Sequence, residues 1–117
     1  MRSTWRSRCS DTEMRGRLCA LAAAALAVLA TPAAAETIRI SVNKLAFTPA
    51  EISARIGDTI EWVNADFLAH TATARSKDWD LMIAPNQTGR LTLKRPGEIE
   101  YYCRFHPNMT GRISVAE

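Results

Sequence analysis

Residues 96–109 read PGEIEYYCRFHPNM, a turn followed by an alternating strand and a short loop. After the turn at Pro96 and Gly97, the apolar side chains of Ile99, Tyr101 and Cys103 recur with period two and share one face of a predicted β-strand. The loop then places a cysteine, a histidine and a methionine at successive intervals of three residues, so one tight connection can direct three metal-binding side chains toward a common point. These three residues are Cys103, His106 and Met109.

The same alternation recurs on both sides of this segment, and no stretch keeps the 3.6-residue period of an amphipathic helix. The alternating positions are Ile38, Ile40 and Val42; Ile52, Ala54 and Ile56; Ile60 and Trp62; Leu91 and Leu93; and Ile113 and Val115. A further strand is expected from His70 to Thr73, and residues 76–86 are expected to form a longer, irregular connection. The pattern predicts an all-β domain, a small β-sandwich of about seven to eight strands.

The first 35 residues have the composition of a secretory signal peptide. Basic residues up to Arg17 precede an apolar run of about 13 residues, from Leu18 to Ala30, and small residues end at Ala35. We expect cleavage before Glu36, with residues 36–117 forming the mature domain, and Met14 is an alternative start for the same signal. An uncleaved membrane anchor is the competing interpretation, but it needs about 20 apolar residues. The protein is therefore expected in the periplasm, free of the membrane after cleavage.

The net charge of +3 comes from this N-terminal segment, because residues 36–117 hold ten basic and ten acidic side chains. A neutral domain does not support nucleic-acid binding. Of the three cysteines, Cys9 and Cys19 leave with the predicted signal, so Cys103 remains alone and no internal disulfide can form. A small exported domain without a disulfide is expected to be stabilised in another way, and a bound metal is the usual alternative.

Four donors remain for such a metal: Cys103, His106, Met109 and the only other histidine, His70. Taken singly, each has a structural interpretation, such as a buried core thiol or a surface loop histidine. Together, a thiolate, two imidazoles and a thioether suit copper in both oxidation states, with the methionine weak and axial. Zinc rarely takes methionine as a ligand. We therefore predict one copper ion at this site.

Residues 57–64, GDTIEWVN, together with residues 96–103, resemble two strands of the cupredoxins, the small blue-copper proteins. The short loop from Cys103 to Met109 is similar to that of the amicyanins within this family. The resemblance implies a Greek-key sandwich with copper at one end, ligand roles for His70 and the three loop residues, and electron exchange with a c-type cytochrome or a dehydrogenase. Two positions depart from the pattern: Thr71 stands where many relatives have asparagine, and Arg104 stands where threonine or serine is common.

A closed set of protein ligands leaves no open position for a substrate, so we predict outer-sphere electron transfer by a monomer rather than an enzyme. An apolar docking rim of Phe105, Pro107, Met82 and Ile83 is expected around the exposed edge of His106. A carrier that delivers Cu(I) to another periplasmic protein uses the same ligands and is the alternative. A metal-free interaction module would require the Cys, His and Met spacing to be a coincidence.

Overall fold

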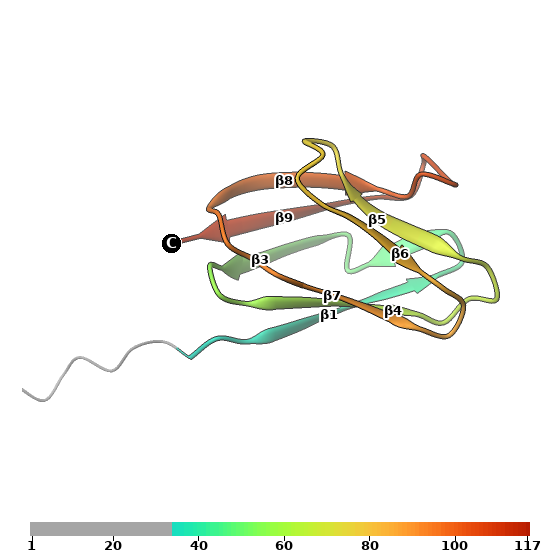
Figure 1. Ribbon diagram of the computed structural model, residues 1–117, viewed down its shortest axis with the longest axis horizontal. Coiled ribbons are helices and arrows are strands. Elements are labelled where there is room, and N and C mark those ends of the chain that lie inside the picture. The colour runs from blue at the N-terminus through green and yellow to red at the C-terminus, as the bar shows by residue number, and fades with distance from the viewer. Residues whose placement is uncertain (1–33) are drawn as a thin grey trace, which may run out of the picture. The chain divides into compact units, whose positions relative to one another are not determined.

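The structure is a computed structural model, and it describes residues 34–117 (Figure 1). Nine strands make up this part of the chain, and no helix is among the described elements. In chain order they are β1 (Thr37–Asn43), β2 (Ala46–Thr48), β3 (Glu51–Arg55), β4 (Thr59–Asn64), β5 (His70–Ala74), β6 (Asp80–Ile83), β7 (Thr88–Thr92), β8 (Gly97–Tyr102) and β9 (Thr110–Ala116).

The strands form two sheets, one ordered β2-β1-β4-β7 and the other β3-β9-β8-β5-β6. Two pairs are parallel, β1 with β4 and β3 with β9, and the chain crosses repeatedly from one sheet to the other. Figure 1 shows the two layers facing each other, with the loop between β8 and β9 at the end of the sandwich away from the C-terminus. The predicted all-β sandwich is confirmed.

The strand count is nine rather than seven to eight because two short strands, β2 and β6, give too little alternation to detect. Strand β6 lies inside residues 76–86, which we expected to be irregular; it pairs with β5 at the edge of its sheet. Ile56, expected on the inner face of β3, lies just beyond that strand and is 42% exposed.

Aromatic side chains fill the centre of the core between the two sheets. Trp62 and Tyr101 are fully buried, and their ring centroids lie 5.6 Å apart. Trp79 and Phe47 also pack against the Tyr101 ring. Because Tyr101 is two residues before Cys103 on the same strand face, this rigid packing continues directly to the predicted metal-binding loop.

The predicted signal peptide lies almost wholly outside the described residues. Ala34 and Ala35, at its expected end, are exposed. Within residues 34–117, no helix has the length and apolar character needed to cross a bilayer.

Candidate metal centre

Strand pairing brings the two donor segments together. Strands β5 and β8 are antiparallel neighbours, with Thr73 opposite Tyr102. The start of β5, at His70, therefore lies beside the end of β8, where Cys103 follows. The loop after β8 closes on itself, because the Cys103 N–H donates to the Met109 carbonyl at 3.1 Å and the Met109 N–H donates to the His106 carbonyl at 2.9 Å.

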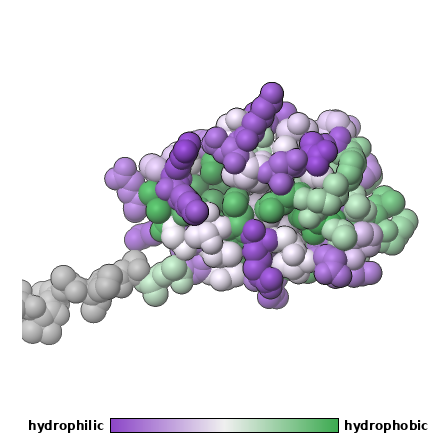
Figure 2. Space-filling model, viewed as in Figure 1, coloured by the Kyte–Doolittle hydropathy of each residue, from purple (hydrophilic) through white to green (hydrophobic). Residues whose placement is uncertain are grey.

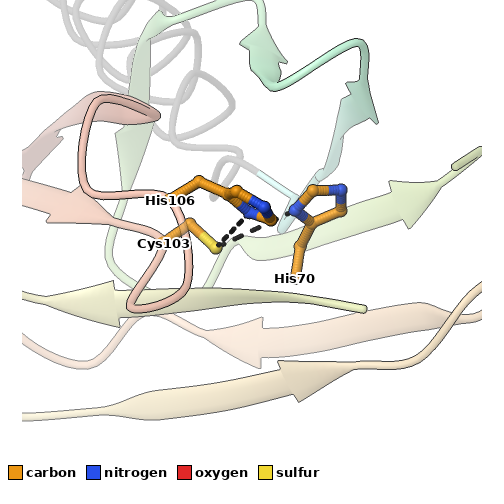
Figure 3. Close-up of side chains that lie close together, drawn as sticks. All are labelled: His70, Cys103 and His106. Carbon is orange, nitrogen blue, oxygen red and sulfur yellow. Dashed lines mark hydrogen bonds between the residues drawn. The ribbon is translucent and has the colours of Figure 1, made fainter. Parts of the chain in front are cut away.

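Three of the four predicted donors converge at this end of the sandwich (Figure 3). The Cys103 Sγ atom lies 3.8 Å from His70 Nδ1 and 3.7 Å from His106 Nδ1. All three donor atoms lie within 4.8 Å of one another. Cys103 and His70 are fully buried, whereas His106 is partly exposed.

This geometry fits a single metal ion. With the bond lengths that thiolate and imidazole make to zinc, about 2.3 Å and 2.0–2.1 Å, a trigonal ion places sulfur and nitrogen about 3.8 Å apart. The two sulfur–nitrogen distances observed are 3.8 and 3.7 Å. One thiolate and two imidazoles next to a methionine are a donor set for copper rather than zinc.

The protein holds the sulfur in the form that a metal requires. Burial alone raises the pKa of the Cys103 thiol, but hydrogen bonding to the sulfur, above all from the Thr71 N–H, outweighs burial and lowers the pKa to about 6. At neutral pH the thiolate predominates, and the thiolate is the metal-binding form.

Met109 lies at the base of the same loop and is 2% exposed. Its backbone is hydrogen-bonded to both Cys103 and His106. The structure thus brings the methionine into the buried part of the loop, next to two of the converging donors.

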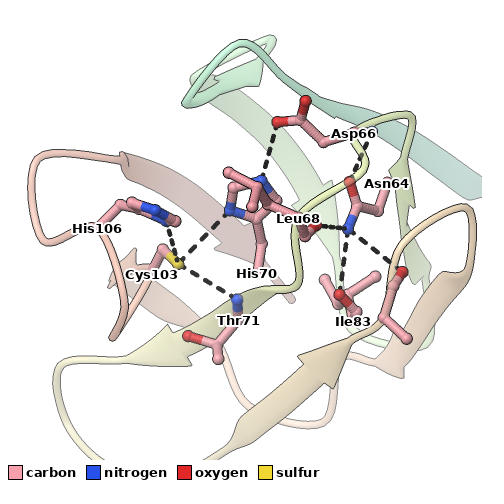
Figure 4. Close-up of polar contacts among 9 residues, drawn as sticks. Asn64, Asp66, Leu68, His70, Thr71, Ile83, Cys103 and His106 are labelled. Carbon is pink, nitrogen blue, oxygen red and sulfur yellow. Dashed lines mark hydrogen bonds and ion pairs between the residues drawn. The ribbon is translucent and has the colours of Figure 1, made fainter.

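A chain of hydrogen bonds orients His70 (Figure 4). The His70 Nε2 atom lies 3.0 Å from a carboxylate oxygen of Asp66. Since a carboxylate only accepts, Nε2 carries the ring proton, and the lone pair of Nδ1 faces the Cys103 sulfur. This carboxylate is not apparent from the sequence pattern; its position four residues before His70 is the one signal that could have indicated it.

Asn64 holds the loop that carries this carboxylate. Its side chain is buried, accepts the Asp66 N–H at 2.9 Å and faces three carbonyl groups, those of Leu68, Ile83 and Ala84, at 2.8–3.2 Å. Asn64 therefore fixes the whole turn between β4 and β5. In the sequence, Asn64 is only the last residue of the segment 57–64 that resembles a cupredoxin strand.

Thr71 connects the two donor segments. Its N–H donates to the Cys103 sulfur at 3.3 Å, and its hydroxyl oxygen accepts the Arg104 N–H at 2.8 Å. Thr71 therefore links the two segments although its side chain is shorter than that of an asparagine.

Figure 2 shows apolar surface at the end of the domain that carries the metal-binding loop. Phe105 is 49% exposed and Met82 is 56% exposed, as the predicted rim requires. Ile83 is 1% exposed, so its place in that rim was wrong: it alternates with Met82 along β6 and points into the core. Phe67, on the turn before His70, is 82% exposed, the highest value for a large apolar side chain among residues 34–117. It was missed because turns have no hydrophobic period.

Comparisons with known proteins agree with this geometry. A family model described as a cupredoxin-like domain matches residues 17–115. The chain is 34% identical to amicyanin-alpha of Methylorubrum extorquens over 103 residues, which cover 82% of this chain and 85% of the relative. It is 31% identical to a plastocyanin of a Synechococcus species over 111 residues, covering 78% and 82% of the two chains. A solved structure of an amicyanin mutant in its reduced Cu(I) form superposes with a TM-score of 0.61 and 26% identity, covering 74% of this chain and 86% of that one.

Proposed function

The chain belongs to the cupredoxin-like family, and from this premise we propose that it is a periplasmic blue-copper electron carrier. One copper ion is held by His70, Cys103, His106 and Met109. The observation that carries the proposal is the convergence of one buried thiolate and two imidazole nitrogens within 4.8 Å of one another.

Bound copper supplies a one-electron change between Cu(I) and Cu(II). The residues of the chain shield the ion and connect it to the surface. Cys103 and His70 are buried and keep water away from the ion, while the partly exposed ring of His106 gives a short path to a partner at the surface. With all donors supplied by the protein, no position remains for a substrate, in agreement with relatives that are electron carriers.

The hydrogen bonds around the donors favour electron transfer over metal delivery. His70 is fixed through Asp66, and Thr71 joins the two donor segments, so the geometry changes little between oxidation states. A carrier that hands over Cu(I) would need these donors to release the ion readily.

The apolar surface around His106 supports brief docking of redox proteins, such as a c-type cytochrome or a periplasmic dehydrogenase. Phe105 precedes His106 on the loop, Phe67 lies on the turn before His70, and Met82 pairs with Thr71; all three side chains are exposed. A small interface suits a complex that must separate after each transfer. We propose that the protein acts as a monomer.

Copper loading tests the function. Purified protein is titrated with Cu(II), and the visible spectrum is recorded before and after ascorbate. We expect an intense blue thiolate-to-copper band that bleaches on reduction and returns on reoxidation, and Cys103→Ala should remove it. Binding of Cu(I) alone, without a blue oxidised form, would favour copper delivery instead.

We also propose that residues 1–35 are a signal peptide cleaved before Glu36. A contact at the new terminus supports this position: the Glu36 nitrogen lies 2.9 Å from a carboxylate oxygen of Asp58. The Asp58 carboxylate is buried and also accepts the Arg55 N–H, and these two hydrogen bonds lower its pKa. Cleavage before Glu36 would turn this amide into a charged amino group and strengthen the bond.

Mass spectrometry of the protein exported by a bacterial host should give a chain that begins at Glu36. This chain should also melt at a higher temperature than one that retains Ala35, and Asp58→Asn should abolish the difference. Equal melting temperatures for the two chains, or a different terminus, would contradict the assignment.

A further inference from the structure

Four residues form a closed ring of hydrogen bonds beside the Cys103 sulfur, through three side-chain bonds and the backbone N–H of Arg104. The Arg104 N–H donates to the Thr71 hydroxyl oxygen at 2.8 Å, and the Thr71 and Thr73 hydroxyl oxygens lie 3.0 Å apart. Thr73 donates to the Asp80 carboxylate at 2.6 Å, and the same carboxylate oxygen accepts the Arg104 Nε–H at 3.1 Å. The ring joins β5, β6 and the loop after β8.

The proton directions in this ring follow from the donor inventory. Asp80 only accepts, so Thr73 gives its single hydroxyl proton to the carboxylate. The Thr73 oxygen must then accept from Thr71, whose own oxygen accepts the Arg104 N–H. Every bond runs in one direction toward the carboxylate, and bonds arranged in this way polarise one another.

Burial separates the ring into two halves. Thr71 is fully buried and Thr73 is 7% exposed, whereas the side chains of Asp80 and Arg104 are 49% and 41% exposed. The ion pair alone therefore contributes little to stability. The Asp80 carboxylate acts mainly on the buried half of the ring, because it fixes the hydroxyl of Thr73 and, through that hydroxyl, the position of Thr71.

We propose that Thr73 and Asp80 are positioning residues that act through Thr71 to set the N–H···S hydrogen bond at Cys103 and thereby raise the reduction potential of the copper centre. The inference rests on the proposed function. A hydrogen bond to the thiolate withdraws electron density from the sulfur, which weakens its donation to Cu(II) and favours Cu(I). The Thr71 N–H is that donor, at 3.3 Å.

A matched pair of substitutions at position 73 tests the ring. Thr73→Val keeps the shape and removes the hydroxyl, while Thr73→Ser keeps the hydroxyl. We expect Thr73→Val to lower the reduction potential and shift the energy of the blue band. In Thr73→Ser, both should stay close to the wild-type values.

A second pair tests the carboxylate. Asp80→Ala should lower the potential in the same direction as Thr73→Val. Asp78→Ala is the control, because it removes an equal charge two residues earlier, on the turn before β6, where the described contacts of Asp78 involve only its backbone. An equal shift of the reduction potential in both alanine variants would show that only the lost surface charge matters. It would contradict the proposal that Asp80 acts through Thr73 and Thr71.

The amide resonance of Thr71 in the copper-free protein provides an independent measurement by NMR. Thr73→Val and Asp80→Ala should move this resonance and speed its hydrogen exchange, whereas Asp78→Ala should not. Variants that melt at lower temperature but keep the wild-type potential and Thr71 resonance would show that the ring only stabilises the fold. If the wild type bound no copper, the proposed function would fail. If the Thr71 resonance still moved in Thr73→Val and Asp80→Ala, the positioning of Thr71 by these two residues would nevertheless be supported.

Discussion

The two histidines of the metal centre are held in contrasting ways. His70 is fully buried at the start of a strand, and its Nε2 is paired with Asp66, which Asn64 in turn fixes. His106 lies on a short loop and is partly exposed. Within residues 34–117, the one side-chain hydrogen-bond partner of its ring is the Cys103 sulfur.

This difference indicates separate roles for the two histidines. The buried histidine needs a defined tautomer and a fixed direction, because nothing else can correct its position in a dry core. The exposed histidine needs access, because electrons must pass between the copper and a partner at the surface. Disturbing the supports of His70 should therefore affect binding and stability, while disturbing the surroundings of His106 should affect mainly partner contact.

The largest effect is expected at Asn64. Asn64→Ala leaves three carbonyl groups and the Asp66 N–H without their side-chain partner in a buried turn. The free energy of unfolding should fall by about 3 kcal/mol, measured by urea denaturation, and copper should bind more weakly. Asn108→Ala, an exposed position on the His106 loop, is the control and should change neither. Equal losses of stability and copper affinity in the two variants would contradict the proposed difference between the supports of His70 and the surroundings of His106.

A smaller, more local effect is expected at Asp66. Asp66→Ala removes the acceptor of the His70 ring proton but keeps the backbone bond to Asn64. Copper affinity should fall by about 10–100-fold, measured by competition with a chelator, while the copper-free protein unfolds nearly as the wild type does. An unchanged affinity would mean that the carboxylate does not orient the ligand.

The smallest effect concerns pH and the thiolate between the two histidines. Burial raises the pKa of Cys103, but hydrogen bonding to the sulfur, above all from the Thr71 N–H, outweighs burial and lowers the pKa from 9.0 to about 6. Because the folded pKa is lower than the unfolded one, the stabilisation of the copper-free protein is complete above the unfolded pKa and disappears as pH falls through about 6.

The melting temperature of copper-free protein should therefore rise between about pH 6 and pH 9. Cys103→Ala should remove this part of the rise, leaving the contribution of other groups. The same rise in both proteins would show that the thiol titrates normally in the fold.

Much of the sandwich could be predicted because its longer strands alternate strictly. Ile40, Trp62 and Ile113 are each buried on the predicted face, and the Cys, His and Met spacing indicated a loop at one end. Strand β6 could not be predicted, since four residues at a sheet edge give no usable period. Asn64, Asp66 and Asp80 were missed for a different reason: their roles depend on partners brought close only by the fold.

One comparison separates the two histidines and tests the metal centre at the same time. His70→Gly and His106→Gly are each loaded with Cu(II), and imidazole is added while the blue band is followed. The partly exposed position should accept imidazole in place of the lost ring, so His106→Gly should regain the band, whereas the sealed position in His70→Gly should not. Recovery in His70→Gly but not in His106→Gly would contradict the assignment of His70 as the buried ligand and His106 as the exposed one. A blue band in either variant before imidazole is added would contradict the assignment of that histidine as a ligand.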